Sequence, residues 1–324
     1  MAQSELYRIH LDSLRLSCVT LASVAEKTLG ESVLARRLGD MASRLPGPAL
    51  EPEDTDLPHP EEAVHLIAGA QASLNLLSQA GQFSELGERI AQGLRSTLDD
   101  LEAALGCELR RELQARIHGL YVIIDPLVTR GRNPVDIARQ ALEGGARLLQ
   151  LRDKKRDKGQ SLPLSLTMRD LCLESDALFI VNDHADLASA VRAHGVHVGL
   201  TDLPIASARA ALGIGQLVGR SNHTLDEALE TQSQGADYIA VGAMYPTSSK
   251  DQPIVAGPEL LRRVKASVKA PVVAIGGITS ARVEAVIRAG ADALCVISAV
   301  GLAANPTEAT RKLVDSIERA GGKA

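Results

Sequence analysis

Charged side chains stand at the ends of several short apolar runs in the second half of this sequence. Arg152 and Lys154 end one run, and Lys250 follows another. Such cations bind phosphoryl oxygens, arginine through paired hydrogen bonds and lysine as a point charge. Asp183 and Asp202 follow two successive runs, and two neighbouring carboxylates repel each other unless a cation lies between them. Mg²⁺ held by one or two carboxylates and substrate phosphates is a usual arrangement, so these residues predict a diphosphate site with Mg²⁺.

Other run ends suit a second phosphate. Gly276 and Gly277 end the apolar run at 272–277, and Ser298 lies in the next run, at 293–299. In barrel proteins that bind phosphate, the last two strands commonly end in such residues, whose backbone N–H groups bind the phosphate. The pattern therefore predicts a site for two substrates, with the diphosphate on one side and a monophosphate on the other. Further polar residues that lie at run ends or follow them are Gln150, Asn182, Ser221, His223, Thr247 and Ser249.

Eight β-rich runs must position these side chains, with amphipathic helical segments between them. Eight strand–helix units over about 200 residues predict an α/β fold, the (β/α)8 TIM barrel, whose active site lies at the C-terminal ends of the strands. A doubly wound sheet is the alternative that the pattern leaves open. The runs cover residues 120–125, 148–154, 178–183, 195–200, 217–223, 238–244, 272–277 and 293–299.

Residues 1–115 have a different pattern, and we expect them to form a small all-α N-terminal domain of about four helices. Apolar residues recur there every three or four positions, which places them on one helical face. A proline-rich acidic loop at 46–62 interrupts the helical pattern, and a barrel domain of residues 119–324 follows. The two clearest faces consist of Leu11, Leu14, Cys18, Leu21 and Ala25, and of Leu34, Leu38, Met41 and Leu45.

The amino-acid composition limits the classes of binding partner that we expect for this protein. The net charge of −5 gives no reason to expect nucleic acid or a membrane surface, and aromatic residues make up only 2% of the chain, without tryptophan. No apolar run reaches the roughly 18 residues that span a bilayer, and no signal peptide is evident. The four cysteines show no metal-binding spacing, so we expect them to fill core space. The sequence thus predicts a cytoplasmic protein acting on small molecules, with homo-oligomerisation left open.

Seven motifs in order resemble those of the thiamine phosphate synthase family. The resemblance covers the whole barrel, and it is their joint order, at strand ends, that makes them specific. The motifs are QLRDK (150–154), ND (182–183), GVHVGLTD (195–202), SNHT (221–224), GADYIAVGAMYPTSSK (235–250), AIGGIT (274–279) and VISA (296–299).

The resemblance implies a role for each matching residue. The family condenses hydroxymethylpyrimidine diphosphate with hydroxyethylthiazole phosphate, giving thiamine phosphate and pyrophosphate. Pyrophosphate leaves first, and the thiazole nitrogen captures the pyrimidine cation. Asp183 and Asp202 would bind Mg²⁺. The pyrimidine diphosphate would be held by Gln150, Arg152, Lys154, Asn182, Ser221 and Lys250, of which Arg152, Lys154, Ser221 and Lys250 would serve catalysis, and the thiazole phosphate by Thr247, Ser249, Gly277, Ile297 and Ser298.

Some positions depart from the family pattern or allow a second interpretation. Ser249 replaces a threonine but keeps its hydroxyl, Asp153 is one methylene shorter than the usual glutamate, and His184 stands where arginine is common. Asp202 precedes a helical segment that it could simply cap. His197 alternates within a strand, which favours a packed or supporting histidine over a catalyst, whereas the role of His223 stays open.

The N-terminal segment YRIHLDSLRLSCVTLASVAE (7–26) is loosely similar to the opening of the hydroxymethylpyrimidine phosphate kinase domain that some bacterial members carry. It has lost an asparagine and most of the charged positions, and the chain has no GxxxxGK[ST] nucleotide loop. We therefore interpret it as a degenerate relative without kinase activity. For the barrel, thiazole tautomerase and a non-catalytic thiamine-precursor sensor are the alternatives. The intact diphosphate and metal residues argue against both.

Overall fold

The structure is a computed structural model that describes residues 2–47, 57–79, 85–246 and 255–324. The chain divides into two compact units, Met1–Leu109 and Arg110–Ala324. None of the described helices combines the length and the apolar character needed to cross a membrane.

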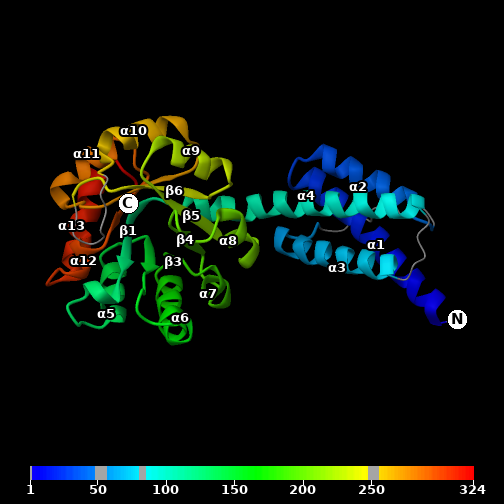
Figure 1. Cartoon of the computed structure of the whole chain (residues 1–324), viewed down its shortest axis with the longest axis horizontal. Coiled ribbons are helices and arrows are strands. Elements are labelled where there is room, and N and C mark those ends of the chain that lie inside the picture. Colours follow the sequence, from blue (N-terminus) through cyan, green and yellow to red (C-terminus); the bar gives the residue numbers. More distant parts are fainter. Residues whose placement is uncertain (1, 48–56, 80–84, 247–254) are drawn as a thin grey trace. The chain divides into compact units, whose positions relative to one another are not determined.

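The first unit is helical, as expected. Its buried core contains every residue of the two predicted faces except Met41, which packs against that core while partly exposed. The segment assigned to the acidic loop ends earlier than expected, because a helix begins at Pro60. The described helices are α1 (Ala2–Lys27), α2 (Ser32–Arg44), α3 (Pro60–Gln79) and α4 (Glu85–Ala115), the last of which continues into the second unit (Figure 1).

The second unit is a closed barrel of eight parallel strands, which confirms the predicted TIM barrel and excludes a doubly wound sheet. The first strand pairs with the last, Tyr121 lying opposite Cys295. The strands are β1 (Gly119–Ile124), β2 (Leu148–Leu151), β3 (Leu178–Asn182), β4 (Gly195–Val198), β5 (Leu217–Asn222), β6 (Tyr238–Gly242), β7 (Val272–Ile275) and β8 (Ala293–Val296).

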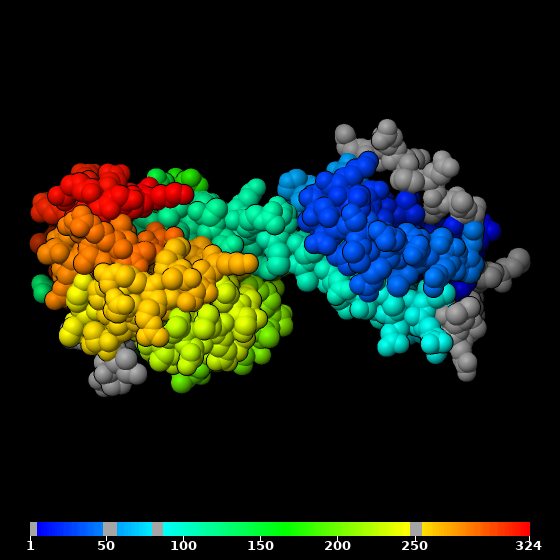
Figure 2. Space-filling model, turned by 90° about the horizontal axis from the view of Figure 1, so that it is seen from above, coloured from blue at the N-terminus to red at the C-terminus, as the bar shows by residue number. Residues whose placement is uncertain are grey.

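Helices surround the strands in Figure 1, and in Figure 2 the yellow, orange and red atoms of the last part of the chain lie next to one another. Their N-termini carry ordinary caps where the sequence provides them: Thr224 and Glu227 form a capping box, and Asn305 caps the last helix. The helices are α5 (Pro134–Glu143), α6 (Lys158–Glu174), α7 (Ala185–Ala190), α8 (Ile205–Ala211), α9 (Leu225–Ser233), α10 (Gly257–Ser267), α11 (Val283–Arg288), α12 (Ser298–Gly301) and α13 (Pro306–Arg319), with short 3₁₀ turns at Pro126–Val128 and Ser280–Arg282.

Both faces of the strands are buried, which explains why the sequence shows apolar runs instead of strict alternation. Alternate residues nevertheless separate into two cores. Leu120, Val122 and Ile124 point outward to the helices, whereas Tyr121 and Ile123 point into the barrel. This alternation decides which polar residues face the interior of the barrel.

The cysteines follow the prediction in part. Cys18, Cys172 and Cys295 are buried, whereas Cys107 is exposed. The expectation that all four fill core space is wrong for Cys107, whose side chain is exposed on α4.

Candidate active site

The C-terminal ends of the strands, which we call the mouth of the barrel, enclose a cavity of about 320 Å³. Six of the residues that the sequence predicted for the site line it, from four successive strands and the loops after them. The predicted strands ran one to three residues too far, and those extra residues are the loop positions that carry polar groups. The lining residues are Arg152, Lys154, Asn182, Asp183, His197, Gly199, Thr201, Asp202 and Ser221.

Asp183 and Asp202, here called the acid pair, meet in this cavity. The Asp183 side chain hydrogen-bonds to that of Asp202, and Lys154 forms an ion pair with Asp183. The backbone of Asp183 has a φ of 62°, the left-handed region that non-glycine residues rarely adopt, and its N–H donates to the carbonyl of His197 at 2.8 Å. Such local strain persists only where surrounding contacts impose it, and here it turns the carboxylate toward its partner.

Asp202 does not cap the helix that follows it. The N-cap of α8 is Pro204, and the Asp202 carboxylate instead accepts the N–H of Gly199 at 2.7 Å. The sequence left capping and metal binding open for this residue. Its carboxylate lies in the turn after β4, beside Asp183, so it faces the cavity.

The two carboxylates of the acid pair differ in pKa. Burial raises the pKa of Asp183, the Asp202 carboxylate adds to that rise, and Lys154 opposes it. Burial also disfavours the charge on Asp202, but the Gly199 N–H and the Asp183 hydrogen bond lower its pKa overall. The pair therefore holds its place with a shared proton or with a cation between its oxygens. No third His, Cys, Asp or Glu joins the pair as a possible metal ligand within the described ranges.

Arg152 is held by a carboxylate that sequence reasoning did not select. Asp125, the residue after β1, is buried and forms an ion pair with the Arg152 guanidinium, while its other oxygen accepts the Leu127 N–H at 2.9 Å. In the part of the chain that the structure describes, the Nε of Arg152 is buried without a hydrogen-bond partner. A phosphoryl oxygen in the cavity would supply the missing acceptor. The acidic end of the run at 120–125 was the available signal for Asp125.

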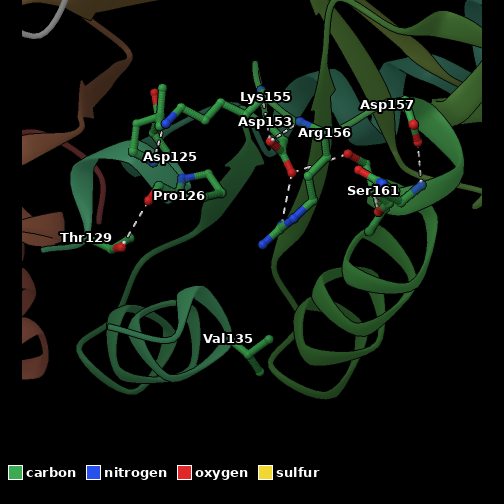
Figure 3. Close-up of polar contacts among 12 residues, drawn as sticks. Asp125, Pro126, Thr129, Val135, Asp153, Lys155, Arg156, Asp157 and Ser161 are labelled. Carbon is green, nitrogen blue, oxygen red and sulfur yellow. Dashed lines mark hydrogen bonds and ion pairs between the residues drawn. The ribbon is translucent and has the colours of Figure 1, made fainter. Parts of the chain in front are cut away.

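The loop after β2 is organised by Asp153, the shortened member of its motif. Its carboxylate accepts hydrogen bonds from the N–H of Arg156 at 3.2 Å, the Arg156 side chain at 3.0 Å and the Ser161 hydroxyl at 3.2 Å (Figure 3). Asp153 thus fastens the loop to the start of α6, and it leaves Arg152 and Lys154 on either side to face the cavity. The substitution of glutamate by aspartate falls on a structural position.

The strands β7 and β8 form the other half of the mouth. Gly276 and Gly277 have φ values of 102° and 63°, and a Cβ on Gly277 would lie 2.8 Å from the carbonyl oxygen of Pro246, so only glycine fits there. Ile297 is buried, and Ser298 is exposed at the first position of α12. Arg282 donates to the carbonyl of Gly277 at 2.6 Å and stacks over Tyr245. The predicted residues Thr247, Ser249 and Lys250 lie outside the described residues.

Two of the lining residues, Asn182 and Ser221, and the predicted residue Gln150 have contacts that the structure also defines. Asn182 is buried at the end of β3, and Gln150 is buried inside the barrel, where its amide donates to the Tyr121 hydroxyl at 2.7 Å. Ser221 contacts the Nε2 atom of His197 at 2.8 Å. His197 therefore supports a predicted ligand residue, as its place in the strand suggested.

The structure shows the surroundings of His223 and His184, the two histidines whose roles the sequence left undecided. The Nδ1 of His223 lies 2.6 Å from the carbonyl oxygen of Gly242, and its backbone N–H donates to Glu227, so it ties β5 to β6. His184 precedes α7 and makes no side-chain cap. Neither is among the residues that line the cavity.

The fold and the site together define a class: a TIM barrel whose mouth carries arginine, lysine and a pair of carboxylates after β2 to β4, and a glycine turn after β7. The sequence profile of the family described as thiamine monophosphate synthase matches residues 120–300. The chain belongs to this family.

Individual relatives agree. The thiamine-phosphate synthase of Methanospirillum hungatei is 41% identical over 198 residues, which are 61% of this chain and 96% of that protein. The bifunctional thiamine biosynthesis protein ThiED of Geobacter sulfurreducens is 46% identical over 184 residues, 57% of this chain but only 37% of that protein. Among solved structures, a thiamine phosphate pyrophosphorylase from Pyrococcus furiosus is 40% identical with a TM-score of 0.60, covering 65% of this chain and all (100%) of that one.

Proposed function

We propose that this chain is a transferase that joins hydroxymethylpyrimidine diphosphate to hydroxyethylthiazole phosphate, releasing pyrophosphate and thiamine phosphate. The observation that carries the proposal is the division of the mouth. Cations and the acid pair follow β2 to β4, and a glycine turn and a helix N-terminus follow β7 and β8. Family membership supports the same reaction.

The half of the mouth after β2 to β4, to which we assign the diphosphate, contains the cations that stabilise a leaving pyrophosphate. Arg152 is held by Asp125 with its Nε still available, and Lys154 is partly exposed beside Asp183. As the bond between the pyrimidine methylene carbon and the diphosphate oxygen breaks, the electron pair stays on that oxygen and its charge grows. Preorganised cations stabilise that growing charge more than they stabilise the substrate.

The acid pair fits Mg²⁺ by its chemistry. The two carboxylates lie in contact, and the pKa of Asp183 is raised. A divalent ion between them would relieve their repulsion, and their oxygens are ligands of the kind that Mg²⁺ prefers. Asp183 and Asp202 would hold the ion, which would neutralise diphosphate oxygens when bound.

The second half of the mouth positions the nucleophile. Gly277 and Ser298 would bind the phosphate of the thiazole, with Thr247 and Ser249 from the loop after β6. The lone pair of the thiazole nitrogen then forms the new bond to the methylene carbon, and no protein nucleophile or proton transfer is needed. Catalysis is therefore the holding of two reactants in line, together with charge stabilisation.

The test uses the purified full-length chain with both substrates and Mg²⁺. We expect thiamine phosphate and pyrophosphate to form in equal amounts, and neither to form when one substrate is omitted. Arg152→Gln should lose activity, whereas Arg192→Gln, a control in the loop between α7 and β4, should keep it. Pyrophosphate release without thiamine phosphate, or no product from an intact folded protein, would contradict the proposal.

A further inference from the structure

A chain of polar side chains crosses the inside of the barrel beneath the cavity. Gln150 Nε2 lies 2.7 Å from the Tyr121 hydroxyl, which lies 3.3 Å from the Tyr238 hydroxyl. The Tyr238 hydroxyl is 3.0 Å from His197 Nδ1, and His197 Nε2 is 2.8 Å from Ser221 Oγ. These five residues come from β2, β1, β6, β4 and β5, so the chain connects strands around the barrel and ends on a residue that lines the cavity.

The hydrogen bonds of this chain have a preferred direction. The amide nitrogen of Gln150 can only donate, so the Tyr121 oxygen accepts at that end. The Tyr121 hydrogen then has the Tyr238 oxygen as its strong acceptor, beside the weaker sulfur of Cys295. The Tyr238 hydroxyl in turn donates a hydrogen bond to His197 Nδ1. The opposite direction would leave the buried Tyr121 hydrogen without a strong acceptor, which is costly inside a protein.

The two phenols are fixed in place and in protonation. Both are completely buried, and burial raises the pKa of Tyr121 and of Tyr238 far above neutral pH, so each keeps its hydrogen. The Tyr238 ring occupies the space that a side chain at position 219 would need, since a Cβ on Gly219 would lie 1.9 Å from the ring. The ring also stacks on His197, with centroids 5.7 Å apart. A glycine opposite Tyr238 thus allows the phenol to reach the histidine.

We infer that Tyr121 and Tyr238 are positioning residues, which hold His197 as the neutral tautomer with its hydrogen on Nε2 and thereby direct the Ser221 hydroxyl hydrogen into the cavity. Because Nδ1 accepts from Tyr238, the hydrogen of the neutral ring is on Nε2 and donates to Ser221 Oγ. Ser221 then has its own hydrogen available for a ligand.

The direction matters for an anionic ligand. If Ser221 donated to His197, it would present only lone pairs to the cavity, and these repel a phosphoryl oxygen. With its hydrogen free, Ser221 adds a neutral donor beside Arg152 and Lys154. This part of the inference rests on the proposed function, whereas the tautomer of His197 does not.

Nitrogen NMR on the full-length protein labelled with ¹⁵N-histidine tests the tautomer directly. The chain has eight histidines, and loss of one signal in His197→Gln assigns the relevant ring. We expect hydrogen on Nε2 in the unmodified protein, and a mixture of tautomers in Tyr238→Phe. A ring with its hydrogen on Nδ1 in the unmodified protein would overturn the inference, whatever the activity.

Kinetics test the consequence. Tyr238→Phe should lower kcat on the order of tenfold with little change in KM, because Ser221 meets a charge that grows during the reaction. The same substitution in a Ser221→Ala protein should have almost no further effect, since the chain acts through Ser221. Tyr7→Phe, in the N-terminal unit, is the matched control and should leave kcat unchanged.

The outcomes separate the two claims. An unchanged kcat in Tyr238→Phe, or an equal loss with and without Ser221, would refute the positioning role. Circular dichroism and melting temperature check that each variant is folded. If the unmodified protein made no thiamine phosphate although His197 carried its hydrogen on Nε2, the proposed function would fail and the tautomer assignment would stand.

Discussion

Both ends of the barrel contain buried charged side chains, but these differ in whether other protein groups satisfy their hydrogen bonds and charges. At the N-terminal ends of the strands, Asp237 is fully partnered by protein groups. Its carboxylate accepts from Arg110 Nε at 3.0 Å, Arg209 Nη2 at 2.6 Å and the Val218 N–H at 2.7 Å. At the mouth, by contrast, Asp183 faces another carboxylate, and Arg152 has a buried Nε without an acceptor in the described part of the chain.

The difference separates a structural charge cluster from a functional one. Around Asp237 the positive and negative groups satisfy one another, so nothing remains for a ligand. The mouth has like charges in contact and a donor still unused, an arrangement that a metal ion and a phosphate would complete. In TIM barrels the N-terminal end generally serves stability and the C-terminal end chemistry, which agrees with this contrast.

The largest expected effect is loss of the acid pair. Asp183→Asn should reduce thiamine phosphate formation to below detection, and excess chelator should do the same to the unmodified protein, because the diphosphate would lose its counterion. Stability should change little, since an asparagine can still hydrogen-bond to Asp202 and only the ion pair with the partly exposed Lys154 is lost. Full activity in excess chelator would exclude the magnesium assignment.

An aspartate-to-asparagine substitution at the N-terminal end of the barrel should instead lower stability and leave activity unchanged. Asp237→Asn should destabilise the barrel by about 3 kcal/mol, because it leaves two partly buried arginines without their shared charge. Below the melting temperature its kcat should equal that of the unmodified protein. Chemical denaturation and initial rates on the same sample check both statements; a loss of kcat without a loss of stability would reverse the comparison.

Within the mouth, the two halves should also differ. Lys250→Ala should lower kcat by on the order of 10²-fold, as loss of one preorganised charge stabiliser does elsewhere. Ser298→Ala should instead raise KM for the thiazole phosphate, whose charge does not change in the reaction. Steady-state kinetics with each substrate varied distinguish them, and a normal kcat in Lys250→Ala with a lost kcat in Ser298→Ala would place the two phosphates the other way round.

The smallest effect is expected from removing the helical unit. A chain starting at Gly106 should keep kcat within about twofold, because Arg110 and Gln114, which bond to Asp237, remain. A chain starting at Arg116 should be less stable. The full-length protein should not phosphorylate hydroxymethylpyrimidine phosphate from ATP, and detection of that activity would contradict a degenerate kinase domain.

Much of the barrel could be predicted from the sequence, because each strand is a local apolar run and each run ends in polar residues. The acid pair followed from position alone, since consecutive parallel strands bring their ends together. The partners across the barrel could not be predicted. Tyr121 and Tyr238 are 117 positions apart, and their contact depends on which residues face inward and on the space that Gly219 leaves. Asp125 was missed although the rule for strand ends applied to it, because it ends the run at 120–125 and its ion pair with Arg152 joins the ends of the neighbouring strands β1 and β2.

The measurement that tests the central contrast most directly is Mn²⁺ binding, followed by the electron paramagnetic resonance signal of the free ion in the presence of pyrophosphate. Mn²⁺ takes the same oxygen ligands as Mg²⁺. The account predicts a single tight site in the unmodified protein, its loss in Asp183→Asn and in Asp202→Asn, and its retention in Asp237→Asn. Equal binding by all four proteins would contradict it, because the ion would then lie somewhere other than the acid pair.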